Sequence, residues 1–198
     1  MNKRGLGAAI IAVIGLFIMI IIIIVVTGYN GLVDKDENVN SAFSQIEVTL
    51  AERYQKITSL VATVNGLQDH AEDIYNAITE ARAAYATASA NKDVEGLIEA
   101  DYLQSLALTD LIALVVNEDN PYISAEPAYI TLMDEISSSE AELAYARRSY
   151  NLAVEDYNAS VRRFPRVMIA NMFNFDKERV YWKANEGEIE IPEVIFND

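Results

Sequence analysis

The sequence predicts an all-α protein in which an N-terminal transmembrane helix precedes a long helical bundle with coiled-coil-like packing. Three observations support this fold class. The chain starts with a long uncharged apolar stretch, its apolar residues then recur with the period of packed helices, and no proline interrupts the first such repeat. We expect an anchor over residues 1–33, a bundle over residues 34–165, and a short helix with an extended tail over residues 166–198.

The predicted anchor lies in the stretch from Gly5 to Val33, which contains no charged side chain. Its core, Leu6–Val26, has 21 residues, and a helix needs about 20 to cross a bilayer. A cleaved signal peptide is the alternative, but its apolar region is usually about 7–15 residues long and ends in a small-residue cleavage site, which this stretch lacks. We therefore expect an uncleaved span that contacts the lipid bilayer through residues 6–26, with Tyr29 and Asn30 at the membrane interface.

The charges that flank the anchor predict its orientation in the cell membrane. Lys3 and Arg4 precede the span, and the positive-inside rule then places the short N-terminus in the cytoplasm. The bundle of this single-pass protein would lie outside, in the periplasm or at the cell exterior. Two basic residues give only a small difference in charge across the membrane, so the reverse orientation stays open.

The composition excludes several classes of function. The chain has 15 basic and 30 acidic residues and a net charge of −15, which disfavours nucleic acid because phosphates would be repelled. The same charge disfavours close docking on anionic lipid headgroups. The chain has no cysteine, which excludes disulfides and thiolate chemistry.

Apolar residues after the anchor recur at alternating spacings of four and three, which is the signature of helices that pack along one another. Of the 15 positions of this first seam, only Arg53 is not apolar. A continuous helix over the seam would extend about 75 Å. Gly66 is its weak point, and a break there would give two helices. The seam comprises Val39, Phe43, Ile46, Leu50, Arg53, Ile57, Leu60, Val64, Leu67, Ala71, Ile74, Ile78, Ala81, Tyr85 and Ala88.

A second helix is predicted from about Asp93 to Val116, with Asn91 or Asp93 as its cap. Nine of the eleven residues of Leu106–Val116 are apolar, so this helix should be buried on several sides. It would lie either in the middle of the bundle or in a contact between chains.

A third helix is predicted from about Ala125 to Arg163, with Pro127 in its first turn. Val167–Phe173 should form a short apolar helix, and Ile189–Phe196 alternates as an extended segment does. Large and small residues alternate along the seam of the third helix, which lets a neighbour approach closely. That seam comprises Leu132, Ile136, Ser139, Leu143, Ala146, Tyr150, Ala153, Tyr157, Ser160 and Phe164.

Ten residues of these seams are our packing or assembly candidates. They are Phe43, Ile46, Leu50, Arg53, Leu60, Val64, Leu111, Leu114, Tyr150 and Tyr157.

Short motifs spread over nearly the whole chain resemble the LemA family of bacterial membrane-anchored helical proteins. The resemblance implies an antiparallel helical bundle behind one N-terminal span, in a protein of the cell envelope, and it brings no established activity. Ile57-Thr58-Ser59-Leu60 lacks the proline that the family commonly has here, which favours one long first helix, and Glu52-Arg53 replaces a usual basic pair. The motifs are Tyr29-Asn30-x-Leu32-Val33, Asn38-Val39-x-x-Ala42-Phe43-Ser44-Gln45-Ile46-Glu47-Val48-x-Leu50-x-x-Arg53-Tyr54, Leu60-Val61-x-x-Val64-x-Gly66, Glu80-Ala81-Arg82, Ala146-Arg147-Arg148-x-Tyr150-Asn151-x-x-Val154-x-x-Tyr157-Asn158, Phe164-Pro165 and Pro192-x-Val194-x-Phe196.

Arg53 is the main anomaly of the first seam, because a buried guanidinium is costly unless a carboxylate pairs with it. Glu140 and Glu142 on the third helix are the candidate partners. The alternative is that the side chain reaches water past Tyr54.

The sequence contains no constellation typical of catalysis. His70 is the only histidine, and we interpret it as an exposed helical residue because no further metal ligands converge on it. We expect no cofactor, no bound metal and no enzymatic activity.

Two polar features remain. The repeat Tyr150-Asn151 and Tyr157-Asn158 indicates core tyrosines with hydrogen-bonding asparagines beside them. The stretch from Ala83 to Ala146 holds twelve acids and one base, which is typical of a solvated face, or else of a surface for a basic partner or divalent cations.

These features together predict a structural or interaction protein of the cell envelope that forms a homo-oligomer through its helices. The alternative is an adaptor or sensor in envelope stress that acts on a membrane protease or a signalling protein. The sequence gives neither the stoichiometry nor the identity of an envelope-protein partner.

Overall fold

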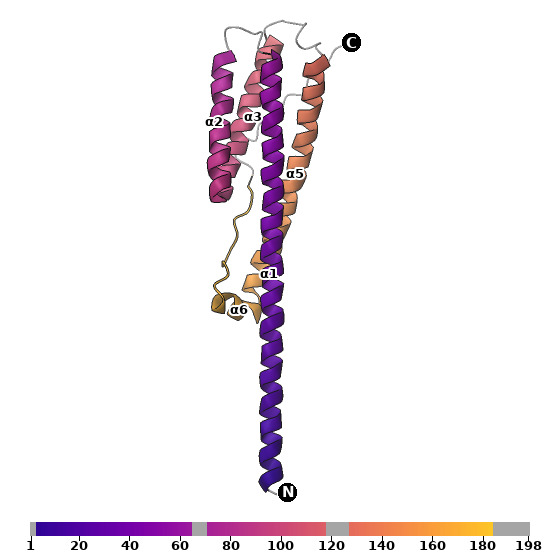
Figure 1. Cartoon of the computed structure of the whole chain (residues 1–198), viewed down its shortest axis with the longest axis vertical. Coiled ribbons are helices and arrows are strands. Elements are labelled where there is room, and N and C mark those ends of the chain that lie inside the picture. Colours follow the sequence, from indigo (N-terminus) through magenta and orange to yellow (C-terminus); the bar gives the residue numbers. More distant parts are fainter. Residues whose placement is uncertain (1–2, 65–70, 118–126, 184–198) are drawn as a thin grey trace. The chain divides into compact units, whose positions relative to one another are not determined.

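A computed structural model describes residues 3–64, 71–117 and 127–183, and these residues form five helices and no strand. The helices are α1 (Lys3–Val64), α2 (Ala71–Asn91), α3 (Val94–Asn117), α5 (Pro127–Arg162) and α6 (Arg166–Met172) (Figure 1). The chain divides into two compact units. The anchor unit comprises Met1–Ser41 and Leu152–Arg179, and the bundle unit comprises Ala42–Asn151 and Val180–Asp198. Helices α1 and α5 contribute to both units.

In the bundle unit, α2 runs alongside α1 in the opposite direction. The guanidinium of Arg82 lies 5.3 Å from the ring centre of Tyr54, and the Tyr85 hydroxyl donates a hydrogen bond of 3.0 Å to the carbonyl of Glu47. Of the two possibilities that the sequence left open for the first seam, the structure has two helices rather than one, because α1 ends at Val64 and α2 begins at Ala71. Folding back lets both halves of the seam bury their apolar residues within one chain.

Helices α2 and α3 are joined by two residues, Lys92 and Asp93. Lys92 adopts a left-handed backbone conformation (φ 52°). Its N–H donates a hydrogen bond to the carbonyl of Ser89, and the N–H of Asp93 donates one to the carbonyl of Ala88. These two hydrogen bonds form a Schellman motif, which ends α2. Helix α3 then begins at Val94, one residue after the start predicted from the sequence.

The apolar core of the bundle unit draws on all four of its helices. Helix α3 supplies the largest share, so its buried apolar residues pack against the other helices of the same chain. The cluster comprises Ile57, Leu60, Val61, Ile74, Ile78, Ala107, Leu108, Leu111, Ile112, Val115, Tyr129 and Ile136.

Helix α5 runs antiparallel to α1 in the bundle unit. The ring of Phe43 lies 6.1 Å from the ring of Tyr150, whereas Lys56, further along α1, donates to the carbonyl of Glu135, which comes earlier in α5. The last predicted seam position of this helix, Phe164, is wrong: the helix ends at Arg162, and Phe164 is 81% exposed.

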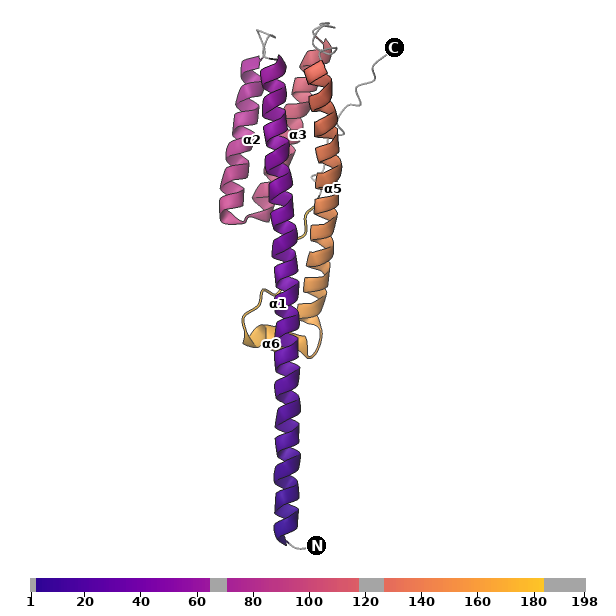
Figure 2. The ribbon, with the colours of Figure 1, turned by 45° about the vertical axis from the view of Figure 1, so that its right-hand side comes forward.

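In the anchor unit, α6 packs beside α1 (Figures 1 and 2). Ile169 of α6 is buried against Gly28, where a Cβ would overlap its Cδ1 atom. The ring of Tyr29 lies 4.8 Å from the ring of Phe173 and 5.7 Å from that of Phe175. The predicted short helix Val167–Phe173 is thus present, shifted by one residue.

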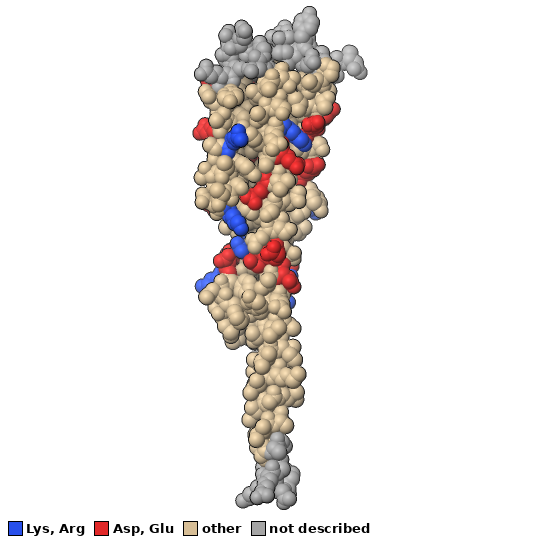
Figure 3. Space-filling model, viewed as in Figure 1, with Lys and Arg blue, Asp and Glu red and all other residues tan. Residues whose placement is uncertain are grey.

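The N-terminal part of α1 is apolar and exposed. It is the one helix, among those that the structure describes, that is long and apolar enough to cross a membrane. The visible face of this part carries no charged residue down to the undescribed N-terminus (Figure 3). The predicted extended tail, Ile189–Phe196, lies outside the described residues.

Candidate functional site

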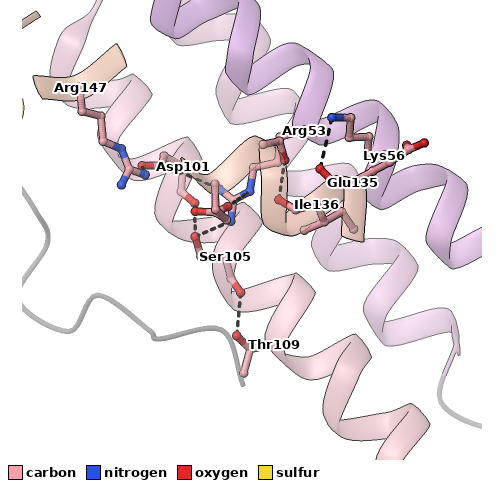
Figure 4. Close-up of polar contacts among 10 residues, drawn as sticks. Arg53, Lys56, Asp101, Ser105, Thr109, Glu135, Ile136 and Arg147 are labelled. Atoms are coloured by element: carbon pink, nitrogen blue, oxygen red, sulfur yellow. Dashed lines mark hydrogen bonds and ion pairs between the residues drawn. The ribbon is translucent and has the colours of Figure 1, made fainter. Parts of the chain in front are cut away.

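Arg53 is the centre of a buried ion-pair network in the bundle unit. Its side chain is fully buried. Its Nη1 atom donates to Asp101 Oδ1 at 2.9 Å, its Nη2 atom donates to Ser105 Oγ at 2.9 Å, and its Nε atom pairs with Glu140 Oε1. Figure 4 shows Arg53 of α1 directed at Asp101 and Ser105 of α3.

A second arginine completes the network. Arg147 of α5 pairs with Asp101 Oδ2, so the carboxylate of Asp101 binds one arginine through each of its oxygens (Figure 4). The network thus balances two guanidinium groups with two carboxylates on three helices. A charged group in a low-dielectric interior needs this compensation, since an unpaired one would cost several kcal/mol, roughly 3–5 in measured cases. Arg147 also lies 5.9 Å from the ring centre of Trp182, a cation–π distance.

The network answers the question that the sequence left open about Arg53. Glu140 is its partner, as predicted, whereas Glu142 is exposed. The alternative that Arg53 reaches water is wrong, because none of its side chain is exposed. Sequence reasoning missed Asp101, although a signal existed: Asp101 lies on the apolar face of α3, between Leu97 and Leu108 at helical spacing.

Two further polar groups are buried in the bundle unit. Gln104 is 2% exposed, and neither its side-chain oxygen nor its nitrogen has a hydrogen-bond partner among the described residues. The Tyr129 hydroxyl also has none within that part of the chain, and burial raises the pKa of this phenol. A buried polar group that has no hydrogen-bond partner reduces stability by about 1–3 kcal/mol.

The charged side chains of this network are paired with one another. Both oxygens of Asp101 accept from guanidinium groups, and Arg53 uses all three of its nitrogens, so these partners are already engaged. No three metal-ligating side chains converge among the described residues, and His70 lies outside them. What the network can do is fix the register of α1, α3 and α5, because a slip of one turn would separate the charges.

The two Tyr-Asn pairs of α5 form a second set of polar contacts. In the bundle unit, the first pair, Tyr150 and Asn151, binds the main chain of residues 180 and 182. Tyr150 donates from its hydroxyl to the carbonyl of Val180 at 2.8 Å. The Asn151 side chain donates to the carbonyl of Trp182 at 2.9 Å and accepts from its N–H at 2.8 Å. The side-chain amide thus satisfies both main-chain groups of one residue.

The second Tyr-Asn pair does the same in the anchor unit. Tyr157 donates to the carbonyl of Asp176 at 2.8 Å, and Asn158 exchanges two hydrogen bonds with the main chain of Arg179, of 2.9 and 2.7 Å. Arg179 in turn donates to Asp36 Oδ1 at 2.6 Å. Burial lowers the pKa of Arg179, but its hydrogen bond and attraction to Asp36 outweigh burial and raise that pKa above its ordinary value. The predicted core tyrosines and asparagines therefore bind a main chain rather than one another.

The other candidate residues differ in their exposure. Phe43, Ile46, Leu50, Leu60 and Leu111 are buried in the bundle unit. Val64 and Leu114 belong to α1 and α3, but their side chains lie outside what the structure describes. Tyr29 and Asn30 are exposed in the anchor unit, where Tyr29 contacts α6 and the residues after it.

One of two comparisons with known proteins identifies the family of the chain. A search of curated proteins finds no match. A family model described as the LemA family matches residues 42–196, a range that contains Arg53, both Tyr-Asn pairs and the segment that these pairs bind. Because this match covers most of the chain, the chain belongs to the LemA family.

Proposed function

We propose that the protein is a membrane-anchored structural or interaction protein of the cell envelope that self-assembles and has no enzymatic activity. The observation that carries this proposal is α1, a single helix over Lys3–Val64 that supplies both the exposed apolar span and the first helix of the bundle unit. In the proposed orientation the N-terminus is cytoplasmic and the bundle lies outside.

Self-assembly would use surfaces other than the seam residues that are buried within one chain. Several large apolar side chains of the bundle unit are exposed instead, among them Val48 of α1, which is 52% exposed, and Tyr145 of α5, which is 72% exposed. The antiparallel pairs Phe43–Tyr150 and Arg53–Glu140 place Val48 and Tyr145 at the same level of neighbouring helices. We therefore take these two exposed side chains as the ones to test for a contact between copies.

The test is the mass of the full-length protein in mild detergent, measured by light scattering over a dilution series. We expect a discrete oligomer for the natural sequence and a shift toward monomer for the double variant Val48→Ser/Tyr145→Ser. Tyr75→Ser is the matched control, since Tyr75 is 61% exposed on α2 and its removal should leave the mass unchanged. A natural chain that is monomeric at every dilution would refute self-assembly.

The second candidate function is an adaptor or sensor that acts on a membrane protease or a signalling protein in envelope stress. The acidic surface of α3 and of the linker before it favours this function, because Asp93, Glu95, Glu99 and Asp110 are all exposed there. A field of one sign attracts partners of the opposite charge, so the partner would present a basic surface. Cross-linking in membranes separates the two functions: an adaptor yields a monomer or dimer joined to a different protein, whereas a scaffold yields ladders of this chain alone.

A further inference from the structure

The anchor unit exposes a group of apolar side chains around α6 that the proposed function does not use. Met168 and Met172 stand one helical turn apart, and they are 59% and 63% exposed. Phe164, before the helix, is 81% exposed, and Phe173, directly after it, is 46% exposed. The opposite side of α6 is apolar too, since Ile169 and Ala170 are buried. A seven-residue helix with apolar side chains on both faces needs an apolar environment on its outer side.

The position of α6 along α1 indicates what that environment is. Ile169 packs against Gly28, which lies two residues beyond Val26, the end of the apolar span. At 1.5 Å per residue this offset is about 3 Å, less than the thickness of a headgroup layer. α6 therefore lies at the level where the span ends, and Figure 3 shows no charged residue on the visible face of α1 below α6.

The charges near α6 also differ from those of the rest of the chain. From Tyr157 to Phe175 the sequence has three arginines and no acid, although the whole chain carries −15. Arg162 and Arg163 are exposed, and Arg162 pairs with Glu178 at 3.1 Å in a solvent-exposed contact that contributes little. Arg166 is half-buried and donates to Ser160 Oγ at 2.8 Å. Aromatic and apolar side chains next to arginines are typical of segments that lie in the membrane interface.

We propose that α6 and the turn at Phe164 form an interfacial element that inserts Met168, Met172 and the two phenylalanines into the headgroup region and binds anionic lipid through its arginines. This proposal rests on the proposed membrane anchor, and it adds a second contact with the bilayer. It also modifies what net charge alone implies: the chain as a whole is repelled by anionic headgroups, whereas this basic segment, held at the bilayer surface by α1, is attracted to them.

The experiment uses the fact that the chain has no cysteine, so a single one can be introduced and labelled. The full-length variant Met168→Cys carries a nitroxide in vesicles of phosphatidylcholine and phosphatidylglycerol, and its collision rates with oxygen and with a water-soluble nickel chelate report its depth. Two matched sites bracket it: Ile18→Cys, 51% exposed within the span, and Tyr145→Cys, 72% exposed on α5. We expect the ratio of oxygen to nickel collisions at Met168 to be several-fold above that at Tyr145 and below that at Ile18.

The other outcomes would refute either the interfacial element or the membrane anchor itself. If Ile18 is in lipid but Met168 collides with nickel as freely as Tyr145, the interfacial element is refuted and the anchor stands. If Ile18 is also in water, the anchor itself fails. A label at Met168 that neither reagent reaches would mean that protein covers α6, which also refutes the proposal.

The lipid charge is tested with the same labelled protein in vesicles of phosphatidylcholine alone. We expect Met168 to move toward water there, and Arg163→Gln to produce the same shift in the mixed vesicles. Equal depth in both lipids would refute the anionic-lipid contact.

Discussion

The side-chain amide of Asn158 pairs with both main-chain groups of Arg179, at 2.9 Å to the carbonyl and 2.7 Å from the N–H. A neighbouring β-strand would ordinarily supply such a pair, but here a helical side chain does so. Seven residues earlier along α5, Asn151 makes the same pair of hydrogen bonds with Trp182. An extended segment can therefore bind to a helix with its main chain satisfied, although no sheet is formed in the described residues.

Asn158→Ala should remove both hydrogen bonds and leave the main-chain groups of Arg179 unpaired. Unmade hydrogen bonds of this kind reduce stability by about 1–3 kcal/mol. We expect that loss in urea unfolding of the full-length protein in detergent, together with faster hydrogen exchange at the Arg179 amide. Asn76→Ala, at an exposed position of α2, is the control and should change neither quantity. Unchanged exchange at Arg179 in Asn158→Ala would contradict this role.

Arg53→Leu should destabilise the bundle, because Asp101 and Glu140 would each lose a buried cationic partner. Removing one partner of a buried ion pair typically reduces the free energy of unfolding by about 3–5 kcal/mol. Urea unfolding measures the loss, and Arg148→Leu, at an exposed position of α5, is the matched control.

The double variant Arg53→Leu/Asp101→Leu tests whether the charges act together. It should lose less stability than the sum of the two single changes, because Arg53 and Asp101 share an ion pair that each single change already removes. An Arg53→Leu protein as stable as the natural one would show that the network contributes no stability.

The stability of the protein should fall at alkaline pH, partly through Tyr129. Burial raises the pKa of Tyr129 in the folded state above the value of about 10 that it has when unfolded. The contribution of the neutral phenol is therefore complete below about pH 10 and is lost as the pH rises through the folded-state pKa.

Tyr129→Phe should show this directly. At neutral pH its free energy of unfolding should equal or slightly exceed that of the natural protein, since no described residue bonds the Tyr129 hydroxyl. As the pH rises above about 10, the free energy of unfolding of the variant should fall less than that of the natural protein. Part of the fall should remain because burial and Asp36 also raise the pKa of Tyr157. The exposed Tyr145→Phe is the control, and urea unfolding at a series of alkaline pH values gives the comparison. An identical decline in Tyr129→Phe and the natural protein would argue against this effect.

Gly96→Ala should destabilise the protein, although alanine normally stabilises a helix interior by about 1 kcal/mol relative to glycine. A Cβ at Gly96 would lie 2.9 Å from the Cβ of Ala88 on α2 and 2.8 Å from Asp93 Oδ2. The Cβ of Ala88 cannot rotate away, so the two helices would have to separate. Thermal unfolding should show a lower Tm for Gly96→Ala and a partial recovery in Gly96→Ala/Ala88→Gly. A higher Tm for Gly96→Ala would contradict the close approach of α2 and α3.

The local pattern of the sequence was enough to predict the helices and the faces that they bury. The start and end of α3, α5 and α6 lie within two residues of their predicted positions, because caps, prolines and apolar periods act over one or two turns. Phe164 is the exception, since the apolar spacing continued beyond the end of α5 at Arg162.

The partners of the polar residues were harder to predict. Glu140 could be named from the sequence because two acids lay near the expected level of the third helix. The position of Asp101 on the apolar face of α3 indicated burial, but its pairing with Arg53 depends on how α3 packs beside α1 and α5. The main-chain groups that Asn151 and Asn158 bind were equally out of reach, since they belong to a segment without a periodic pattern.

The sequence by itself determined the apolar anchor, the helical seams and the one charge that interrupts them, because the burial of a helix face depends on residues three and four apart. Only the tertiary structure decided that the first seam folds back as α1 and α2 of one chain. A hairpin within a chain and a long helix paired with another copy bury the same side chains, so local periodicity cannot distinguish them. The choice depends on long-range packing against α3 and on the ion pairs that join three helices.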